Sequence, residues 1–295
     1  MNPEFLREGL AVSDFMYPDR IVIGGINKKS IEIVSNLYKN YRGVPIVKTN
    51  CKTAEMIKYT SNSLFATMIS FTNEMANLCS KTPNVDIKDV MSAVYLDRRL
   101  SKAHDKNLPE FTTYLEAGCG FGGSCFPKDV KAIIEFGNNV DSDTKILKAV
   151  IQTNNNQPSK MIELAKNHFK SLKKIKISIL GFSFKPQTND IRESPALKIT
   201  EKLIKEGAII YAYDPVAKKE VLNHFKNQKI HFFDDLKSAI LKADVVMIIT
   251  KWDEFQKVPQ LIRENNPSAI LIDGRRMINK KFVKNYEGIG VKGSQ

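Results

Sequence analysis

The 295-residue chain lacks the features that mark several classes of protein. It has no apolar run of the roughly 18–20 residues that a membrane-spanning helix needs, and its first residues lack the basic and apolar regions of a signal peptide. Its four cysteines form no C-x-x-C pair, and its four histidines form no H-E-x-x-H motif. The sequence therefore disfavours a disulfide framework and a structural zinc site, and it predicts a cytoplasmic protein.

Acidic residues are scarce relative to basic ones, above all in the C-terminal half. The net charge is +13, and residues 157–295 contain 26 Lys and Arg against 15 Asp and Glu. A basic domain can bind nucleic acid, an anionic membrane or an anionic small ligand, but scattered lysines are also typical of a solvated surface. No aromatic residues are interleaved with them as in a nucleic-acid-binding module. We therefore expect neither nucleic acid nor a membrane as a partner.

The hydrophobic pattern divides the chain into three parts. Residues 1–50 show a strand, a helix capped by Ser30 that runs to Tyr41, and a second strand at 44–47, which is typical of the end of a larger domain. Residues 51–156 favour helices throughout, and we expect a homodimer interface there. The long first helix of this part has an apolar stripe formed by Ile57, Leu64, Met68, Phe71, Met75 and Leu78, and further helices are predicted at 86–95, 127–136 and 144–169.

Residues 157–295 switch to an alternation of strands and helices. This alternation predicts an α/β domain with a doubly wound parallel, Rossmann-like sheet, in which ligands bind at the carboxyl ends of the strands. The candidate strands are 175–180, 208–213, 230–233, 244–249 and 269–272, and the candidate helices between them are 195–206, 216–226, 235–242 and 258–264.

A glycine-rich loop before Cys125 carries the most specific pattern. Gly118, Gly120 and Gly123 match G-x-G-x-x-G, but no hydrophobic strand precedes them as a dinucleotide fingerprint requires. A better interpretation is that the loop lets a ligand approach the backbone and places Cys125 at the N-terminus of a helix starting near Pro127. That position stabilises the nucleophilic thiolate. The alternative is a small cysteine packed in a tight turn.

Other polar groups stand where chemistry is possible. Lys58 and Asn62 are four residues apart on one helical face, although such a pair is also typical of a solvated surface. The start of the chain, N-P-E-F-L-R-E-G, crowds two carboxylates and an arginine, or is a frayed terminus. Lys185 and Arg192 follow the first strand of the C-terminal sheet, where they can meet phosphates, and Arg275 and Arg276 lie on the same rim after the last predicted strand.

Four motifs of the chain, in order, resemble those of the UDP-glucose/GDP-mannose dehydrogenase family. They are N-P-E-F-L-R-E-G, A-E-M-I-K-Y-x-x-N, G-F-G-G-S-C-F-P-K-D, and F-K-P-x-T-x-D-x-R-E-S-P with D-G-R. The resemblance covers essentially the whole chain. Y-D-P-V-A at 213–217 and T-K-W-D-E-F at 250–255 resemble the UDP-glucose branch more than the GDP-mannose branch, and Ser124 replaces the His typical of the N-acetyl sugar branch.

The resemblance implies a four-electron oxidation of UDP-glucose to UDP-glucuronate with NAD. Cys125 would form a thiohemiacetal and then a thioester, Lys58 and Asn62 would stabilise the oxyanion at C6, and Glu4 and Asp129 would serve proton transfer and hydrolysis. The resemblance also implies substrate contacts from Phe5, Leu6, Glu8, Arg99, Phe121, Gly122, Gly123, Phe184, Lys185 and Arg275, with Arg99 reaching across a dimer interface, and NAD contacts from Lys128 and Arg192.

The chain departs from the family at its start. Family members begin with an NAD-binding domain that carries G-x-G-x-x-G, and residues 1–50 resemble only the end of it, so we expect most of that domain to be lacking. Two alternatives to an active UDP-glucose 6-dehydrogenase stay open. One is a catalytically inactive nucleotide-sugar-binding dimer, and the other is a GDP-mannose 6-dehydrogenase.

Overall fold

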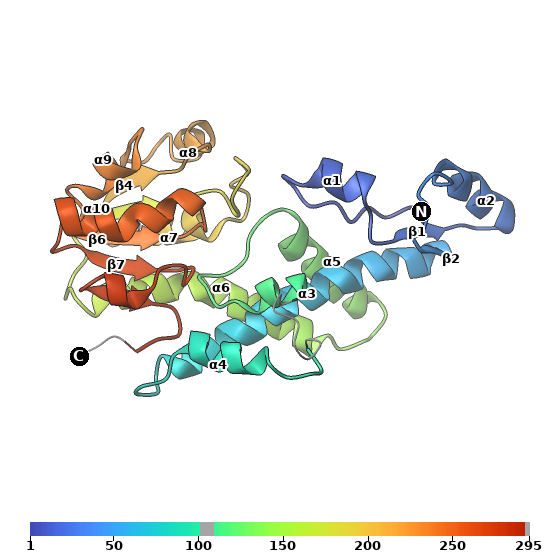
Figure 1. Cartoon of the computed structure of the whole chain (residues 1–295), viewed down its shortest axis with the longest axis horizontal. Helices are drawn as coiled ribbons and strands as arrows, with labels where there is room; N and C mark the ends of the chain where they lie inside the picture. The colour runs from blue at the N-terminus through green and yellow to red at the C-terminus, as the bar shows by residue number, and fades with distance from the viewer. Residues whose placement is uncertain (101–108, 293–295) are drawn as a thin grey trace. The chain divides into compact units, whose positions relative to one another are not determined.

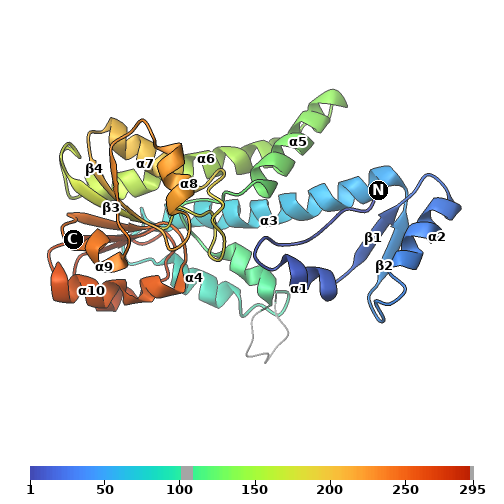
Figure 2. The ribbon, with the colours of Figure 1, turned by 90° about the horizontal axis from the view of Figure 1, so that it is seen from above.

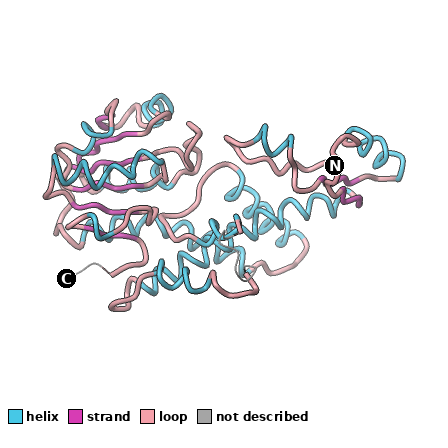
Figure 3. The backbone as a smooth tube through the Cα atoms, in the orientation of Figure 1, coloured by secondary structure: helices cyan, strands magenta, loops and turns pink. Residues whose placement is uncertain are grey.

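The structure is a computed structural model that describes residues 1–100 and 109–292. It divides the chain into two compact units, Met1–Leu64 and Phe65–Gln295. The long helix α3 (Cys51–Cys79) contributes its first turns to the first unit and the remainder to the second. Figure 3 shows that each unit contains strands, and the described residues form a two-stranded sheet and a six-stranded sheet.

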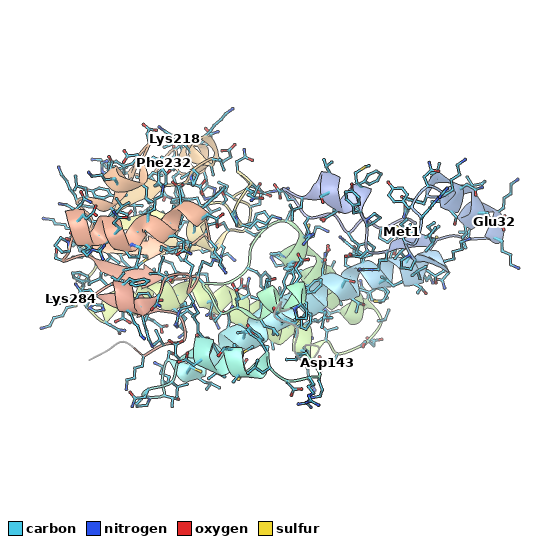
Figure 4. The ribbon with its side chains drawn as sticks, viewed as in Figure 1. Met1, Glu32, Asp143, Lys218, Phe232 and Lys284 are labelled. Carbon is cyan, nitrogen blue, oxygen red and sulfur yellow. The ribbon has the colours of Figure 1, made fainter. Side chains whose placement is uncertain are left out.

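The first unit is built on the parallel pair β1 (Ile21–Gly24) and β2 (Ile46–Thr49), with α1 (Ala11–Met16) and α2 (Lys28–Leu37). The backbone of Met1, labelled in Figure 4, exchanges hydrogen bonds of 2.8 and 2.7 Å with Gly24 of the buried strand β1. The frayed-terminus alternative is therefore wrong. The predicted Ser30 cap is also wrong, because Asn27 accepts from the Ser30 amide and Ser30 is the third helical residue.

The second unit begins with the remaining helices of the central part. They are α4 (Ile87–Val94), the 3-10 helix η1 (Glu110–Leu115), α5 (Cys125–Asn139) and α6 (Lys145–Lys166). The predicted helices are confirmed, but α5 starts at Cys125 rather than at Pro127. Proline is tolerated in the first helical turn because its missing N–H would have no partner there, so Pro127 does not have to be the first residue.

A six-stranded sheet of parallel strands in the order β5-β4-β3-β6-β7-β8 follows. The order reverses direction between β3 and β6, which confirms the doubly wound prediction. Its elements are β3 (Lys176–Leu180), α7 (Pro195–Lys205), β4 (Ile209–Tyr213), α8 (Lys218–His224), β5 (Ile230–Phe232), α9 (Leu236–Ile240), β6 (Val245–Ile248), η2 (Asp253–Lys257), α10 (Val258–Asn265), β7 (Ile270–Asp273), η3 (Lys280–Phe282) and β8 (Tyr286–Gly288). The last strand, Y-E-G, was not predicted, because it is short and lacks β-branched residues.

Alternating residues of the sheet supply two cores. On one face Ile177 and Ile179 of β3 join Leu203 of α7 and Met161 of α6, and Figure 2 shows α6 and α7 running side by side. On the other face Ile248 joins residues of α9 and α10, which lie against the sheet in Figure 1. Each fully buried aliphatic side chain contributes roughly 1.5–3 kcal/mol, so the sheet is a firm base for the loops at its edge.

Basic side chains of the second unit lie largely on its surface. Lys218 and Lys284, labelled in Figure 4, are exposed. The Nζ atom of Lys218 lies 5.9 Å from the centre of the Phe232 ring, and the same amine pairs with Asp234. No helix in the described part of the chain combines the length and apolar character that a membrane crossing requires.

Candidate active site

The glycine loop 118–124 is fastened by side-chain amides from two helices. Asn73 of α3 accepts a hydrogen bond from the Gly118 amide at 2.7 Å. Asn154 of α6 accepts from the Phe121 amide at 2.8 Å and donates to the Phe121 carbonyl at 3.0 Å. Both asparagines are buried, so these bonds are shielded from water. The loop is thus held on a base of helices.

The same loop is also fastened to the C-terminal sheet. The Cys119 amide donates to the Gly274 carbonyl at 2.9 Å, and the Arg275 guanidinium donates to the Gly120 carbonyl at 3.0 Å. The Gly123 amide donates to the carbonyl of Arg192 at 2.9 Å. Backbone groups along the loop are therefore paired, and the loop cannot move without breaking contacts to several elements.

Glycine is required at two positions by close packing. A Cβ atom at Gly122 would lie 2.5 Å from the Glu193 carbonyl oxygen. At Gly123 it would lie 2.8 Å from the Phe184 ring, and the φ angle of +78° there also disfavours a side chain. The predicted substrate residues Gly122, Gly123 and Phe184 thus lie together. The space beside the two glycines is occupied by Glu193 and Phe184.

Cys125 is the first residue of α5 and is exposed. All four cysteines lie in the described part of the chain, and the others differ from Cys125. Cys79 and Cys119 are buried, and burial raises the pKa of both thiols. Cys51 is half-buried, with its Sγ atom 3.6 Å from the Gly24 carbonyl. The structure confirms the predicted place of Cys125 at a helix N-terminus.

A groove of about 860 Å³ lies beside the start of α5. It is lined by Ser124, Pro127, Lys128, Lys131, Ala132, Ile191, Arg192, Glu193, Leu197 and His224. Lys128 and Arg192, the two predicted NAD contacts, therefore share one cationic groove. In the structure Lys128 pairs with the buried Asp129, and Arg192 pairs with Asp190 at 2.7 Å.

The point where the strand order reverses, the usual ligand crevice of such a sheet, is filled by protein. The side chain of Thr250 occupies the space beside Gly181 and donates to the Ser183 carbonyl at 2.5 Å. Asp214, after β4, accepts from the amides of Phe182, Ser183, Val216 and Ala217 at 2.7–3.0 Å. Its carboxylate holds the loops that follow β3 and β4 together.

Phe184 and Lys185 lie in the loop that follows β3, and Arg275 lies in the loop that follows β7. The Lys185 Nζ atom lies 5.6 Å from the Phe184 ring centre, and Phe184 covers Gly123. The Arg275 Nε atom donates to the Ile249 carbonyl at 2.5 Å in addition to its bond to Gly120. Arg275 therefore joins the glycine loop to the end of β6, a structural task that its sequence position did not indicate.

In the first unit, the chain start contacts α3. The Lys58 Nζ atom donates to the Glu4 carbonyl at 2.6 Å and lies 4.0 Å from the Glu4 carboxylate. It also lies 5.4 Å from the centre of the Phe5 ring, which Arg20 covers at 4.1 Å. The remaining members of this predicted set are the buried Asn62 and the exposed Leu6 and Glu8.

Arg99 lies in the second unit, shortly after α4. Its side chain is 88% exposed and pairs with Asp97 at 2.5 Å. Hydrogen bonds from the Arg99 side chain and amide lower the pKa of Asp97 to about 2. The following residues 101–108 lie outside the described part of the chain.

The residues that anchor the loop were not found by sequence reasoning. Asn73 and Asn154 belong to no chemical motif, and Lys131 is typical of a surface lysine, whereas Asp190 and Asp214 lie within the family motifs but were given no role. The polar positions 73 and 154 inside otherwise apolar helical patterns were the one available signal. Among residues 1–100 and 109–292, no group of three His, Cys, Asp or Glu is arranged to hold a metal ion.

A doubly wound parallel sheet and an exposed thiol at the start of a helix, beside a tightly packed glycine loop, define an α/β protein with a candidate cysteine nucleophile. The chain belongs to the UDP-glucose/GDP-mannose dehydrogenase family. Residues 1–42 match the model of the family's NAD-binding domain, residues 52–156 match its central domain, and residues 178–280 match its UDP-binding domain. The expectation that most of the NAD-binding domain is lacking is therefore only partly supported.

Individual relatives agree. The UDP-glucose 6-dehydrogenase of Rickettsia conorii is 40% identical over 297 residues, covering 99% of this chain and 66% of the relative. That of Bacillus subtilis named YwqF is 38% identical, covering 93% and 60%. The structure of a UDP-glucose dehydrogenase from Pyrobaculum islandicum matches with a TM-score of 0.87 and 33% identity, over 98% of this chain and 63% of that one. The chain thus spans about two thirds of the length of these relatives.

Proposed function

We infer that the chain carries the nucleotide-sugar site and the catalytic thiol of a UDP-glucose 6-dehydrogenase, which oxidises UDP-glucose to UDP-glucuronate. The observation that carries this inference is Cys125, the exposed thiol at the start of α5, next to the fastened glycine loop. Relatives named UDP-glucose 6-dehydrogenase align with nearly the whole chain and support the substrate class. We assign residues 1–50 to cofactor binding, 51–156 to dimerisation and 157–295 to UDP-sugar binding.

The cationic groove fits the cofactor that the family uses. Lys128, Lys131 and Arg192 line it, and the N-terminus of the 15-residue helix α5 adds partial positive charge, which suits the diphosphate of a dinucleotide. Lys128 and Arg192 would hold that diphosphate. NAD, when bound, accepts the hydride that leaves C6 in each of the two oxidations.

The residues of this chain would handle the carbon and the protons. The Cys125 thiolate adds to the C6 aldehyde to give a thiohemiacetal, and loss of a hydride turns this into a thioester that water cleaves. The Lys58 ammonium and the Asn62 amide would stabilise the negative charge on the C6 oxygen. Glu4 and Asp129 would take and return protons and orient the water. Each role follows from the chemistry of the side chain and its motif.

The remaining assignments concern the substrate. Arg275, Lys185 and Phe184 at the rim of the sheet would bind the UDP part, and the backbone of Phe121, Gly122 and Gly123 would shape the sugar pocket. Phe5, Leu6 and Glu8 would bind the substrate from the chain start, and Arg99 would bind it from a second copy. The fixed loop geometry supports the assignment of residues 121–123, because a preformed site loses little entropy on binding.

We further propose that the protein forms a homodimer through α3. Phe71 and Leu78 are seven residues apart on one face of this helix and are 55% and 59% exposed. Large exposed apolar side chains in a row mark an interaction surface. Replacement of Phe71 by Asp should convert the dimer to a monomer in analytical ultracentrifugation, and a dimer that is unchanged would contradict the assignment.

The function is tested by mixing the purified chain with UDP-glucose and NAD and following NADH absorbance, with Cys125→Ser as the matched control. We expect NADH to form with the unaltered chain, and steady turnover to be lost in the variant because no thioester can form. Binding of UDP-glucose without NADH formation would favour the inactive nucleotide-sugar-binding alternative. Oxidation of GDP-mannose in preference to UDP-glucose would overturn the substrate assignment.

A further inference from the structure

Arg276, whose sequence position placed it with Arg275 on the ligand rim, is instead buried in an ion pair with Asp86. Its guanidinium donates to both carboxylate oxygens of Asp86, at 2.7 and 2.8 Å, and to the Ile289 carbonyl at 2.8 Å. The two paired side chains are 6% and 8% exposed. Both bonds to Asp86 come from one nitrogen, Nη2, and Nη1 donates to Ile289, so two nitrogens of the guanidinium are held and its direction is fixed as well as its distance.

Further contacts hold the pair in place. Asp86 is the N-cap of α4, where it accepts from the Lys88 amide at 3.0 Å, and it also accepts from the Lys280 amine at 3.0 Å. The Lys88 amine donates a hydrogen bond to the Arg276 carbonyl at 3.1 Å. Hydrogen bonds to Asp86 outweigh the effect of its burial, so its pKa lies below the ordinary value and the charge is kept. Both the backbone and the side chain of Arg276 are therefore tied to α4.

The backbone at Arg276 is in an unfavourable conformation. Its φ angle is +52°, in the left-handed region that residues other than glycine rarely adopt. Such a conformation persists only where surrounding contacts over-determine it. The ion pair with Asp86, called the clamp below, supplies those contacts. Without the clamp, a return of Arg276 to a negative φ angle lowers the conformational energy of its backbone.

The two residues before Arg276 contact the glycine loop rather than α4. Arg275 donates to the carbonyls of Gly120 and Ile249, and Gly274 accepts from the Cys119 amide at 2.9 Å. One short segment, 274–276, thus fastens α4 on one side and the glycine loop on the other. A change of φ at Arg276 turns the chain between these two anchors, so Arg275 and the loop before Cys125 have to shift.

We propose that Arg276 is a positioning residue whose ion pair with Asp86 holds Arg275 and the glycine loop in the geometry that binds the nucleotide sugar. This assignment rests on the proposed function for its ligand, but the placement of the loop can be measured without ligand. Asp86 and Arg276 do not touch the substrate themselves. They act through the backbone of residues 274–276.

The test uses the full chain with Arg276→Lys and Asp86→Asn, and Ile240→Ala as the control. Lysine keeps the charge but lacks the planar guanidinium that reaches Asp86 and Ile289 together, and asparagine keeps the cap of α4 without the charge. Ile240 is fully buried in the second hydrophobic core, among residues of α9 and α10, and its aliphatic side chain has no group that could form a hydrogen bond or an ion pair. Its truncation lowers the thermal stability without removing an ion pair, so it controls for a general loss of stability. Arg276→Lys is the milder of the two clamp variants and keeps the test available if Asp86→Asn does not fold.

The first readout is amide hydrogen exchange at Cys119 and Phe121. We expect exchange to accelerate about tenfold or more in the clamp variants relative to the control at equal distance below the melting temperature. The second is UDP-glucose affinity by calorimetry, which we expect to weaken about tenfold in the clamp variants and to stay unchanged in the control. If the unaltered chain fails to bind UDP-glucose, the proposed function fails while the exchange result still decides the positioning role. Exchange in the clamp variants equal to that of the control would overturn it.

Discussion

The glycine loop of the second unit and the chain start of the first unit both contain predicted site residues, but they differ in burial and in how their residues are held. The loop is buried, and Asn73, Asn154 and Arg275 fasten its backbone. At the chain start, the Lys58 amine donates to the Glu4 backbone carbonyl and lies 4.0 Å from its carboxylate, and the Glu4 side chain is 62% exposed. Buried, fully paired backbone allows little adjustment, whereas exposed ion pairs contribute little and rearrange easily. We therefore expect the two regions to respond to substitution very differently.

The largest difference is expected between two aspartates that pair with arginine. Asp86→Asn leaves Arg276 charged and buried, and it should lower the free energy of unfolding by about 3 kcal/mol. Asp14→Asn in the first unit loses a pair with Arg7, whose side chain is 40% exposed, and should cost less than about 1 kcal/mol. Urea titration of both variants measures the comparison, and equal losses would remove the distinction between the regions.

The same aspartate predicts a pH dependence. The pKa of Asp86 is lower in the folded chain than in the unfolded chain, so its contribution is fully present above the unfolded value of about 3.9. It is lost as the pH falls through the lower folded value. The stability difference between the unaltered chain and Asp86→Asn should stay constant from neutral pH to about pH 5 and shrink below about pH 4. A difference that grows on acidification would show the opposite sign of the pKa change.

Two glycines provide the next comparison. Gly122→Ala forces a methyl group against the Glu193 carbonyl and should cost about 2 kcal/mol. The methyl group of Gly43→Ala meets no atom within 4 Å. Only the φ angle of +79° is unfavourable there, so the free energy of unfolding should fall by about 1 kcal/mol. Urea titration of the two variants measures the free energy of unfolding of each and so compares the two costs. A smaller cost at Gly122 than at Gly43 would mean that the glycine loop can relax.

The smallest effect is expected at Arg20, which covers the Phe5 ring at 4.1 Å and bonds to Ser61 at 3.3 Å. Replacement by Ala removes a partly exposed cation–π contact and should lower stability by only about 0.5–1 kcal/mol. Thermal unfolding followed by circular dichroism is sufficient to detect it. A loss as large as that of Asp86→Asn would place the chain start among the rigid regions.

Much of the fold was predictable because its elements are regular. The runs at 175–180 and 244–249 are apolar and β-branched, so the parallel sheet and its helices were expected with ends accurate to a few residues. The strand Tyr286–Gly288 could not be expected, since its place is set by pairing with β7 rather than by its own side chains. The N-cap at Asn27 could not be expected either. Asn27 and Ser30 accept hydrogen bonds from each other's backbone amides, and both residue types are common caps, so propensity alone does not say which of the two is the cap.

The candidate site was predictable to the extent that residue chemistry depends on neighbours in sequence. Cys125 followed from its helix-start context, and the structure places it there. The tasks of Asn154 and Arg276 could not be predicted, because each arises from a partner 33 or 190 positions away along the chain. Asp214 resembles a ligand residue in sequence, but five hydrogen bonds to it from neighbouring loops show a structural role.

The central claim is that Cys125 is the thiol that meets the nucleotide sugar. The direct measurement is iodoacetamide labelling of the purified chain, quantified at each cysteine by peptide mass spectrometry, with and without UDP-glucose. We expect Cys125 to react first, buried Cys79 and Cys119 to react last because burial raises their pKa, and UDP-glucose to protect Cys125 alone. Equal labelling of the four thiols, or labelling of Cys125 at the same rate in the presence of bound UDP-glucose, would contradict it.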